Sequence, residues 1–382
     1  MNDIYLDYAS TTPIDPLVMA RMADAMTLDG NFANPASTHA FGWRAREAVE
    51  KARRQVAAAI HCDARELVWT SGATEADNLA ILGVTRHAMA AGRPVHVISS
   101  TIEHKAVLDT LKQAEREGAR VTLLSPHSDG CVRPEQVELA LSDDTVLVSL
   151  MHLNNEVGSL SPIAAIKAVL PESVLLHVDA AQTKGKAPID LRAWGADLVS
   201  LSAHKSYGPK GIGALFVKRG LERQLDAMIH GGGHERGLRS GTLATHQIVG
   251  MGEAFALVDQ LGDNERDRLR ALKSQLARGL NDLGVGINGD SACDTIINAQ
   301  FDGIDAETLM SALPNVAISS GSACNSADLS PSHVLLGMGL TRIQALSSLR
   351  FSIGRFTTPQ QIDAVLSQLG VILAAQTTGA RA

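Results

Sequence analysis

Strand-like and helix-like segments alternate along the first two thirds of the sequence. Seven apolar segments of strand length are predicted at residues 66–70, 95–99, 120–124, 145–151, 174–179, 198–202 and 212–217. Helices are predicted between them at residues 73–90, 105–117, 135–141 and 163–170. Nearly continuous apolar strands joined by helices are typical of a mostly parallel sheet with helices on both faces. We therefore expect an α/β fold with a mixed, mostly parallel seven-stranded sheet that binds ligands at the carboxyl ends of its strands.

The rest of the chain predicts flanking helices and a second, smaller unit. Apolar residues recur at spacings of four and three from Ala45 to Ala59, which is typical of one face of an amphipathic helix. Further helices are expected at residues 16–28, 244–261, 265–283, 306–313, 332–338 and 359–374. Short strands are expected at residues 4–8, 285–288, 295–301, 316–319 and 348–354. We thus predict a large domain at residues 15–260 and a smaller α+β domain formed by residues 1–14 and 261–382.

The composition excludes several classes of function. The 382 residues are 45% hydrophobic and 20% charged, and their formal net charge is −7. This balance predicts a sizeable core and gives no electrostatic basis for direct binding of nucleic acid or an anionic membrane. Residues 1–7 do not resemble a signal peptide, and no apolar segment reaches membrane-spanning length. We therefore expect a cytoplasmic protein.

The cysteines lie far apart, at Cys62, Cys131, Cys293 and Cys324, and form no CxxC pair. A zinc ribbon is therefore not predicted, no resident metal is expected, and free thiols in a reducing compartment are the expectation. Small side chains surround Cys324 in residues 319–327, SSGSACNSA, and predict a mobile loop with no core of its own. Because reactive cysteines lie in accessible, polar surroundings, Cys324 is the predicted reactive thiol.

A lysine stands at the exit of the predicted strand 198–202. Ser202, His204 and Lys205 precede a glycine- and proline-rich turn at residues 208–211. Burial lowers the pKa of a lysine and makes its amine nucleophilic, which is how a protein holds the aldehyde of pyridoxal phosphate as a Schiff base. The alternative is an exposed lysine in a β-turn.

Residues 70–75, TSGATE, follow a predicted strand and open a predicted helix. The backbone N–H groups at such a helix start can bind a phosphate, and the hydroxyl groups can add hydrogen bonds. The alternative is an ordinary capping box with Ser71 as the cap.

Polar side chains also follow other predicted strands. Asp179 could pair with a protonated ring nitrogen and Gln182 could reach a ring oxygen, whereas the alternative for Asp179 is the cap of the next turn. His104 could stack on a flat cofactor and transfer protons, or it could simply begin a helix. Asn154 and Asn155 could supply amide donors.

Arg350 lies in the predicted strand 348–354, on the face opposite Leu349 and Phe351. A guanidinium group can hold a substrate carboxylate through two hydrogen bonds. The alternative is an exposed arginine on a strand.

Taken together, these stretches resemble the cysteine desulfurases of the NifS/IscS kind, within the class V aminotransferase group of fold-type I pyridoxal phosphate enzymes. The resemblance covers nearly the whole chain and rests on motifs in family order: YLDYASTTP, NPAST, TSGATEADNLAI, EHKAVLDT, MHLNNEVG, HVDAAQ, SAHKSYGPKGIGAL, HGGGHERGLRSGT, SSGSACNSADLSPSHVL and LRFSIGRFTT.

The resemblance implies how pyridoxal phosphate is bound. Lys205 is then the Schiff-base lysine, Asp179 pairs with the pyridine nitrogen, Gln182 contacts the ring hydroxyl and His104 stacks on the ring. The implied phosphate ligands are Ala73, Thr74, Ser202, His204 and, from the partner in a homodimer, Thr242. Ala203 stands where a glycine is common in the family, and we expect this departure to be harmless.

The resemblance also implies the reaction and its partners. Asn155 and Arg350 are expected to bind the carboxylate of L-cysteine, and Cys324 to take the sulfur as a persulfide while L-alanine leaves. The loop around Cys324 resembles the branch that passes persulfide to scaffold proteins, and Cys324 could also act as a transient iron–sulfur ligand. An iron–sulfur scaffold, tRNA thiolation and DNA sulfur modification all remain open as destinations. Housekeeping members of the family often carry a longer segment after the helix predicted at 359–374, and that segment helps to dock the iron–sulfur scaffold. The sequence ends soon after this helix, which counts against the iron–sulfur scaffold as the acceptor.

Two alternatives to a cysteine desulfurase are considered. A selenocysteine lyase or another class V pyridoxal phosphate enzyme would keep Lys205 but would not need Cys324. A cofactor-free metal or scaffold protein would use His230 and His234, but the three glycines between them cannot present both ligands on one helix face.

Overall fold

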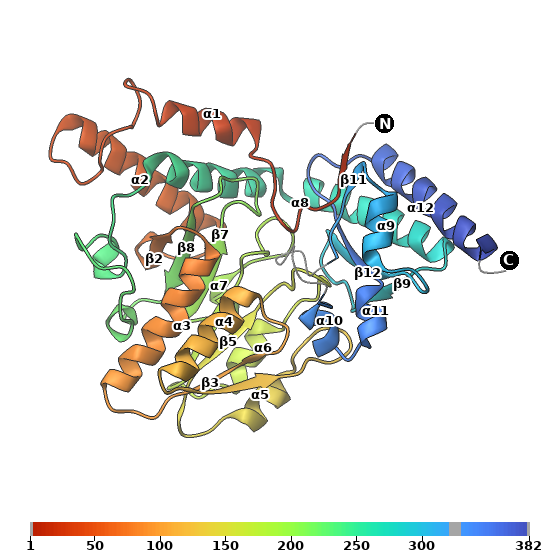
Figure 1. Cartoon of the computed structure of the whole chain (residues 1–382). Helices are drawn as coiled ribbons and strands as arrows, with labels where there is room; N and C mark the ends of the chain where they lie inside the picture. The colour runs from red at the N-terminus through yellow and green to blue at the C-terminus, as the bar shows by residue number, and fades with distance from the viewer. Residues whose placement is uncertain (1–2, 321–329, 380–382) are drawn as a thin grey trace.

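The structure is a computed structural model that describes residues 3–320 and 330–379 (Figure 1). Its largest feature is a mixed seven-stranded sheet with the strand order β2-β8-β7-β6-β5-β3-β4. β8 runs antiparallel to both of its neighbours and the other pairs are parallel. The strands are β2 (Leu67–Thr70), β3 (His96–Ser100), β4 (Arg120–Leu124), β5 (Thr145–Met151), β6 (Leu175–Asp179), β7 (Leu198–Ser202) and β8 (Gly213–Val217). The predicted α/β fold and the mixed seven-stranded sheet are therefore confirmed.

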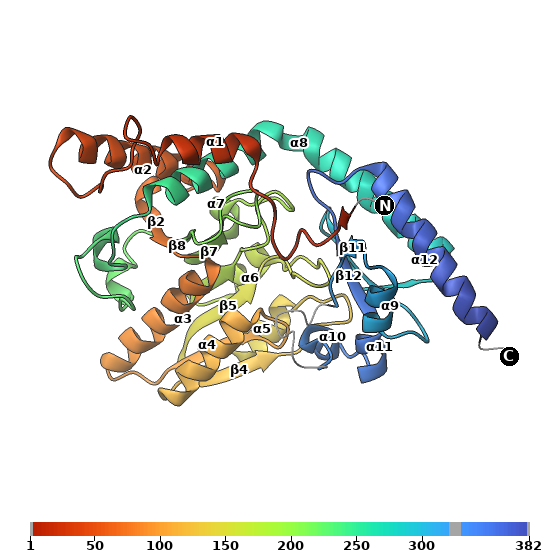
Figure 2. The same ribbon diagram turned by 45° about the horizontal axis from the view of Figure 1, so that its top comes forward.

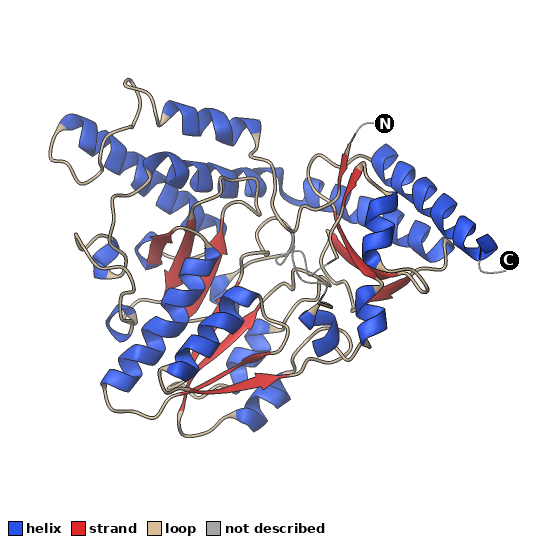
Figure 3. Cartoon of the chain, in the orientation of Figure 1, coloured by secondary structure: helices blue, strands red, loops and turns tan. Residues whose placement is uncertain are grey.

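Helices cover both faces of this sheet (Figure 3). Alternate residues of each buried strand face opposite sides, so Leu147 packs toward α3 and α4 while Val148 packs into the core on the other face. The helices of this unit are α1 (Pro16–Asp24), α2 (Ala40–Ala59), α3 (Ala73–Ala90), α4 (Lys105–Arg116), α5 (Pro134–Ala140), α6 (Ile163–Val169) and α7 (Leu191–Trp194).

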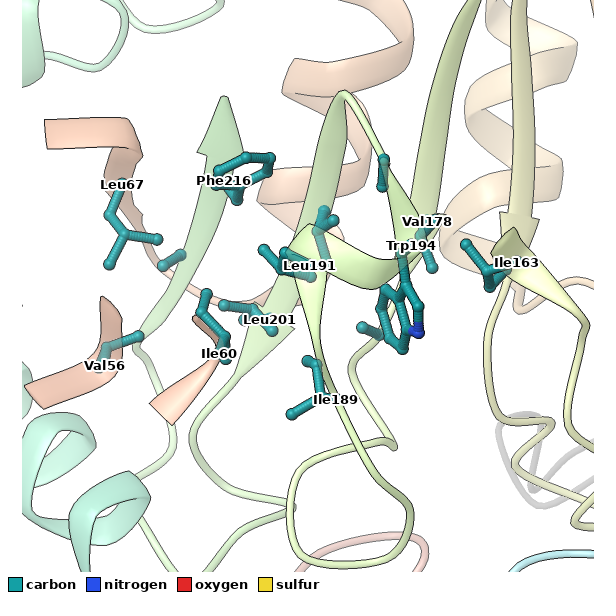
Figure 4. Close-up of a cluster of buried hydrophobic side chains, with 14 of the residues drawn as sticks. Val56, Ile60, Leu67, Ile163, Val178, Ile189, Leu191, Trp194, Leu201 and Phe216 are labelled. Carbon is teal, nitrogen blue, oxygen red and sulfur yellow. The ribbon is translucent and has the colours of Figure 1, made fainter. Parts of the chain in front are cut away.

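The core on the second face joins the sheet to α2, α6 and α7 (Figure 4). Val56 of α2 and Trp194 of α7 lie in the same cluster as Leu201 and Phe216 of the sheet. Ala45, Val49, Ala52, Val56 and Ala59 are all buried, as their helical spacing predicts, although α2 begins earlier, at Ala40. This packing fixes the sheet edge where β6 and β7 end.

A second unit contains the three-stranded sheet β12-β10-β9 and the short parallel pair β1–β11. Its own core gathers residues from both ends of the chain, including Leu6, Leu276, Phe351 and Val365. Figures 1 and 2 show both ends of the drawn chain beside this unit. Its elements are β1 (Ile4–Tyr5), β9 (Gly286–Asn288), β10 (Ile296–Gln300), β11 (Val316–Ala317), β12 (Ser348–Ser352), α9 (Ala306–Ala312), α10 (His333–Gly337), α11 (Arg342–Leu346) and α12 (Pro359–Gly379).

α8 (Thr245–Asp282) consists of two helical segments joined at a kink, where Gly262 has non-helical backbone angles of φ 52° and ψ −141°. The kink agrees with the two helices predicted at residues 244–261 and 265–283. The domain boundary at residues 260 and 261 stays a prediction. Among the described residues, no helix combines the length and apolar character needed to cross a membrane.

Short elements account for the other differences from prediction. The four-residue α7 and five-residue α11 were not expected, because such lengths carry little periodicity. The strand expected at residues 4–8 is only Ile4–Tyr5. The chain also contains 3-10 helices at η1 (Ala64–Glu66), η2 (Glu222–Gln224) and η3 (Glu235–Gly237).

A buried ion pair fastens the glycine-rich segment of residues 230–242 to the large unit. Both terminal nitrogens of Arg53 in α2 contact the two carboxylate oxygens of Glu235, at 2.9 and 2.8 Å. Arg53 also donates to the carbonyl of Leu67, and Glu235 accepts the N–H of Trp69. Because both side chains are almost fully buried, removing the charge of Glu235 leaves the buried guanidinium group of Arg53 with only the half-exposed carboxylate of Glu50 as an ionic partner.

We predict that Glu235→Gln lowers the free energy of unfolding of the large unit by about 3–5 kcal/mol. The measurement is the midpoint of denaturant unfolding followed by circular dichroism. Asp109→Asn, which breaks the exposed Asp109–Lys112 pair, is the matched control and should leave the midpoint nearly unchanged. Equal midpoints for the two variants would contradict this role of the buried pair.

Candidate functional site

A cavity of about 480 Å³ lies where β5, β6 and β7 end. This volume is in the range of small-molecule sites, and the position is the one expected for a mostly parallel sheet. The predicted site residues that line it are Ala73, Thr74, His104, Asn155, Asp179, Gln182, Ser202, His204, Lys205 and Arg350. Two predicted residues are not among them. Thr242 is exposed outside this cavity, and Cys324 lies outside the described residues.

The start of α3 presents backbone N–H groups to the cavity. Its N-cap is Gly72, with φ 156°, and no side chain caps the helix. The predicted alternative, a capping box with Ser71 as cap, is therefore wrong; instead the N–H of Ser71 donates to Glu75 at 2.7 Å. A side chain at Gly213 would come within 2.7 Å of the Gly72 backbone, so β8 can approach the start of α3 only because residue 213 is a glycine. The uncapped helix start can bind an anion.

Asp179 and His104 both reach the cavity, from the ends of β6 and β3, the two strands on either side of β5. Asp179 is the last residue of β6, and its Oδ1 accepts the N–H of Ala181 at 2.9 Å. His104 caps α4 because its Nδ1 accepts the N–H of Ala106 at 3.1 Å. In the neutral ring this bond assigns the proton to Nε2. Asp179 thus caps the turn after β6 and His104 caps α4, as their structural alternatives predicted. Both side chains also line the cavity.

Lys205 brings a positive charge into the cavity. Burial lowers the pKa of His104, and the charge of Lys205 lowers it further. The same two causes, in the same order, lower the pKa of His204 to about 4. Nδ1 of His204 lies 3.1 Å from the hydroxyl of Thr11. Both histidines are therefore neutral at pH 7.

The two adjacent asparagines have different surroundings. The side chain of Asn154 is used inside the protein, where it donates to Ile102 and accepts from the N–H groups of Glu156 and Val157. Asn155 lines the cavity instead. Of the two, only Asn155 keeps its predicted place in the cavity.

Arg350 is buried at the cavity wall and held by groups from a distant part of the sequence. Its guanidinium group donates to the Asn155 carbonyl at 2.8 Å, to Asp7 at 2.7 Å and to the hydroxyl of Ser10 at 2.8 Å. Its Nε is buried and has no hydrogen-bond partner within residues 3–320 and 330–379. The exposed-arginine alternative is therefore wrong, and the Nε donor remains for a further anionic or carbonyl group.

Gln182 has protein partners at both ends of its amide. Its Nε2 donates to the carbonyl of Ala9 at 2.7 Å, and its Oε1 accepts from Lys186 at 2.5 Å. A ligand that contacts Gln182 would have to share one of these groups. The predicted contact with a ring hydroxyl stays a prediction.

Sequence reasoning missed several polar residues of the site. Asp77 and Ser10 line the cavity, and Asp7 orients Arg350 from the other end of the chain. A signal for Asp77 was present, because the residues three, four and seven positions later on its helix are all apolar. In the described part of the chain, no three His, Cys, Asp or Glu side chains are grouped to hold a metal ion. His230 and His234 thus lack a third ligand there.

We predict that Lys205→Met raises the pKa values of His104 and His204, because removal of a nearby positive charge favours the protonated imidazole. NMR titration of the histidine rings measures both values. His152 is the internal control, since burial alone lowers its pKa to about 4. Unchanged titration of His104 and His204 would contradict the placement of the Lys205 charge.

Comparison with known proteins places this site in a family. Residues 4–365 match the family model described as aminotransferase class-V. The chain is 56% identical over 365 residues to the cysteine desulfurase IscS of Pseudomonas putida (strain W619), covering 94% of this chain and 90% of the relative. With the same coverage, it is 53% identical to IscS of Pseudomonas aeruginosa (strain UCBPP-PA14).

Solved structures share the fold over nearly the whole chain. A NifS-like protein has a TM-score of 0.91 and 33% identity, covering 97% of this chain and 99% of its own. SspA, solved in complex with cysteine, has a TM-score of 0.83 and 37% identity, covering 93% of this chain and 100% of its own. The resemblance read from the motifs is confirmed: the chain belongs to the class-V aminotransferase family and, within it, to the cysteine desulfurases.

Proposed function

We propose that the protein is a pyridoxal phosphate-dependent cysteine desulfurase, which converts L-cysteine to L-alanine and leaves the sulfur as a persulfide on Cys324. The observation that carries the proposal is the meeting of Lys205, Asp179 and an uncapped helix start in one cavity. Membership of the cysteine desulfurases supports the same reaction.

The residues of the cavity fit pyridoxal phosphate. The N–H groups at the start of α3 suit its phosphate, together with Ser202 and His204, and Asp179 suits its ring nitrogen. His104 would lie against the ring, and the amine of Lys205 would hold the aldehyde. When bound, the cofactor supplies an electron sink for the substrate's α-carbon. In the homodimer that we propose, Thr242 of a second copy completes the phosphate site.

Proton transfer falls to Lys205 and His104. The amine of Lys205, when it is neutral and not bound to the cofactor, would take the α-proton of cysteine. The neutral imidazole of His104 is fixed by its Nδ1 hydrogen bond, so Nε2 is the atom that can give and regain a proton.

Arg350 and Asn155 would orient the substrate carboxylate. Asp7 and Ser10 hold the guanidinium group in place before substrate arrives, which reduces the entropy lost on binding. Nε of Arg350 has no acceptor among the described residues, and a carboxylate oxygen of the substrate would supply one.

Cys324 would then accept the sulfur atom. Its thiolate attacks the sulfur of the substrate, an S–S bond forms and the C–S bond breaks. Protonation of the remaining carbon gives L-alanine, so one thiol and L-cysteine become one persulfide and L-alanine, with no external oxidant. A persulfide is itself a sulfur donor, and we propose that it passes to an acceptor protein, either an iron–sulfur scaffold or a sulfur carrier. A cytoplasmic location stays a prediction from the sequence.

We predict that Cys324→Ser keeps the absorbance of the bound cofactor but lowers sulfide release from L-cysteine by about 10³-fold or more, the scale on which loss of a covalent nucleophile acts. Alanine and sulfide are measured together, with dithiothreitol as the acceptor. Cys293→Ser is the matched control, because Cys293 is buried and should keep the activity. Normal turnover by Cys324→Ser would refute the role of Cys324.

A further inference from the structure

A row of buried polar side chains lies under α3, beside the cavity. His177 and Asp179 stand two residues apart on β6 and therefore face the same side of the sheet. Nδ1 of His177 lies 2.8 Å from the hydroxyl of Ser149, and its Nε2 lies 2.9 Å from the hydroxyl of Ser200. His177, Ser149 and Ser200 are all 0% exposed. Such a row is costly in a core unless its groups are satisfied.

Asp77 faces this row from the first turns of α3. It is 0% exposed and lines the same cavity as Asp179 and Lys205. Neither carboxyl oxygen has a partner with good hydrogen-bond geometry in the described part of the chain, although the Ser200 hydroxyl lies close enough to favour the charged form of Asp77. Nε2 of His177 lies 3.6 Å from Oδ1, which is too long for a hydrogen bond. Asp77 is thus a fully buried carboxyl group aimed at a ligand cavity without a bonded cation.

A negative charge on Asp77 would be difficult to maintain. An ionised carboxylate without a bonded partner in the interior is so costly that the group takes up a proton instead. Asp179 adds to this cost, because two carboxylates that share a site cannot both ionise easily. Burial and then the charge of Asp179 raise the pKa of Asp77, as does Glu103, while Ser200 and Lys205 act in the opposite direction.

Transfer of the proton from Asp77 to His177 would not resolve the problem. Burial lowers the pKa of His177 to about 3, so an imidazolium ion is disfavoured there. Both ring nitrogens of His177 already have hydroxyl partners. An ion pair of Asp77 and His177 would place two charges in the core at 3.6 Å, without the hydrogen bond that offsets their desolvation.

We propose that Asp77 is a positioning residue of the cofactor site and remains a neutral carboxylic acid, so that Asp179 can carry the negative charge that faces the cofactor's ring nitrogen. The neutral acid adds no second negative charge to the cavity that Asp179 also lines. This use of Asp77 rests on the proposed function, whereas its protonation state is a property of the chain itself and can be measured without turnover.

The experiment compares the full-length protein with Asp77→Asn, a neutral variant of the same shape, by difference infrared spectroscopy at pH 7. We expect the variant to lose a C=O stretching band of a protonated carboxylic acid. Asp179→Asn is the matched comparison and should lose a carboxylate band instead. Loss of a carboxylate band by Asp77→Asn would overturn the proposal. Both outcomes are independent of desulfurase activity, so they are distinguishable from a failure of the proposed function.

Stability against pH gives a second readout with a defined sign. A carboxyl group that is harder to ionise in the folded chain destabilises the fold progressively as the pH rises above about 4, where the unfolded chain loses that proton. The ratio of the folding constants of Asp77→Asn and wild type should therefore rise with pH, by up to about tenfold per unit. A constant or falling ratio, as an ion pair with His177 would give, would overturn the proposal.

A further measurement completes the test. Should Asp77→Asn fail to fold, the unmutated protein labelled with ¹³C-aspartate decides the question. One aspartate carboxyl resonance that is still protonated at pH 7 supports the proposal, and its absence overturns it.

Discussion

The proposed site depends on charged side chains that lie close together where the strands of a buried sheet end. Lys205, Asp179 and Asp77 line one cavity, and the charges of Asp179 and Lys205 shift the pKa of Asp77 in opposite directions. Each charged group at this edge therefore influences the protonation of its neighbours. The proposed function gives Lys205 the role of base and Asp179 a negative charge beside the cofactor, and catalytic sites separate such roles through the surroundings of each group.

Both units of the chain contribute to this edge. The sheet supplies Asp179 and Lys205, while Arg350 belongs to β12 and is oriented by Asp7 from the opposite end of the sequence. Asp7 and Arg350 are 343 residues apart along the chain. The core that joins residues 4–6 to β12 and α12 is thus what brings Arg350 to the cavity at the sheet edge.

Much of this arrangement could be predicted from local sequence. Apolar strands flanked by helices predicted β4, β5, β7 and α3 to the residue, because each has a continuous pattern and clear ends. Polar residues at strand ends predicted Asp179 and Lys205. Contacts between distant segments could not be predicted: Asp7 has no local feature that reveals its bond to Arg350. Asp77 lies on the buried face of α3, where a sequence predicts apolar packing and not a polar site residue.

Chemical trapping of the cofactor tests the account most directly. Borohydride reduction of the purified enzyme fixes the aldehyde carbon of pyridoxal phosphate to the amine that holds it, and mass spectrometry of the peptides then locates the adduct. The account predicts one modified lysine, Lys205. An adduct on Lys184 or Lys186, the buried lysines near the end of β6, or no adduct at all, would contradict it.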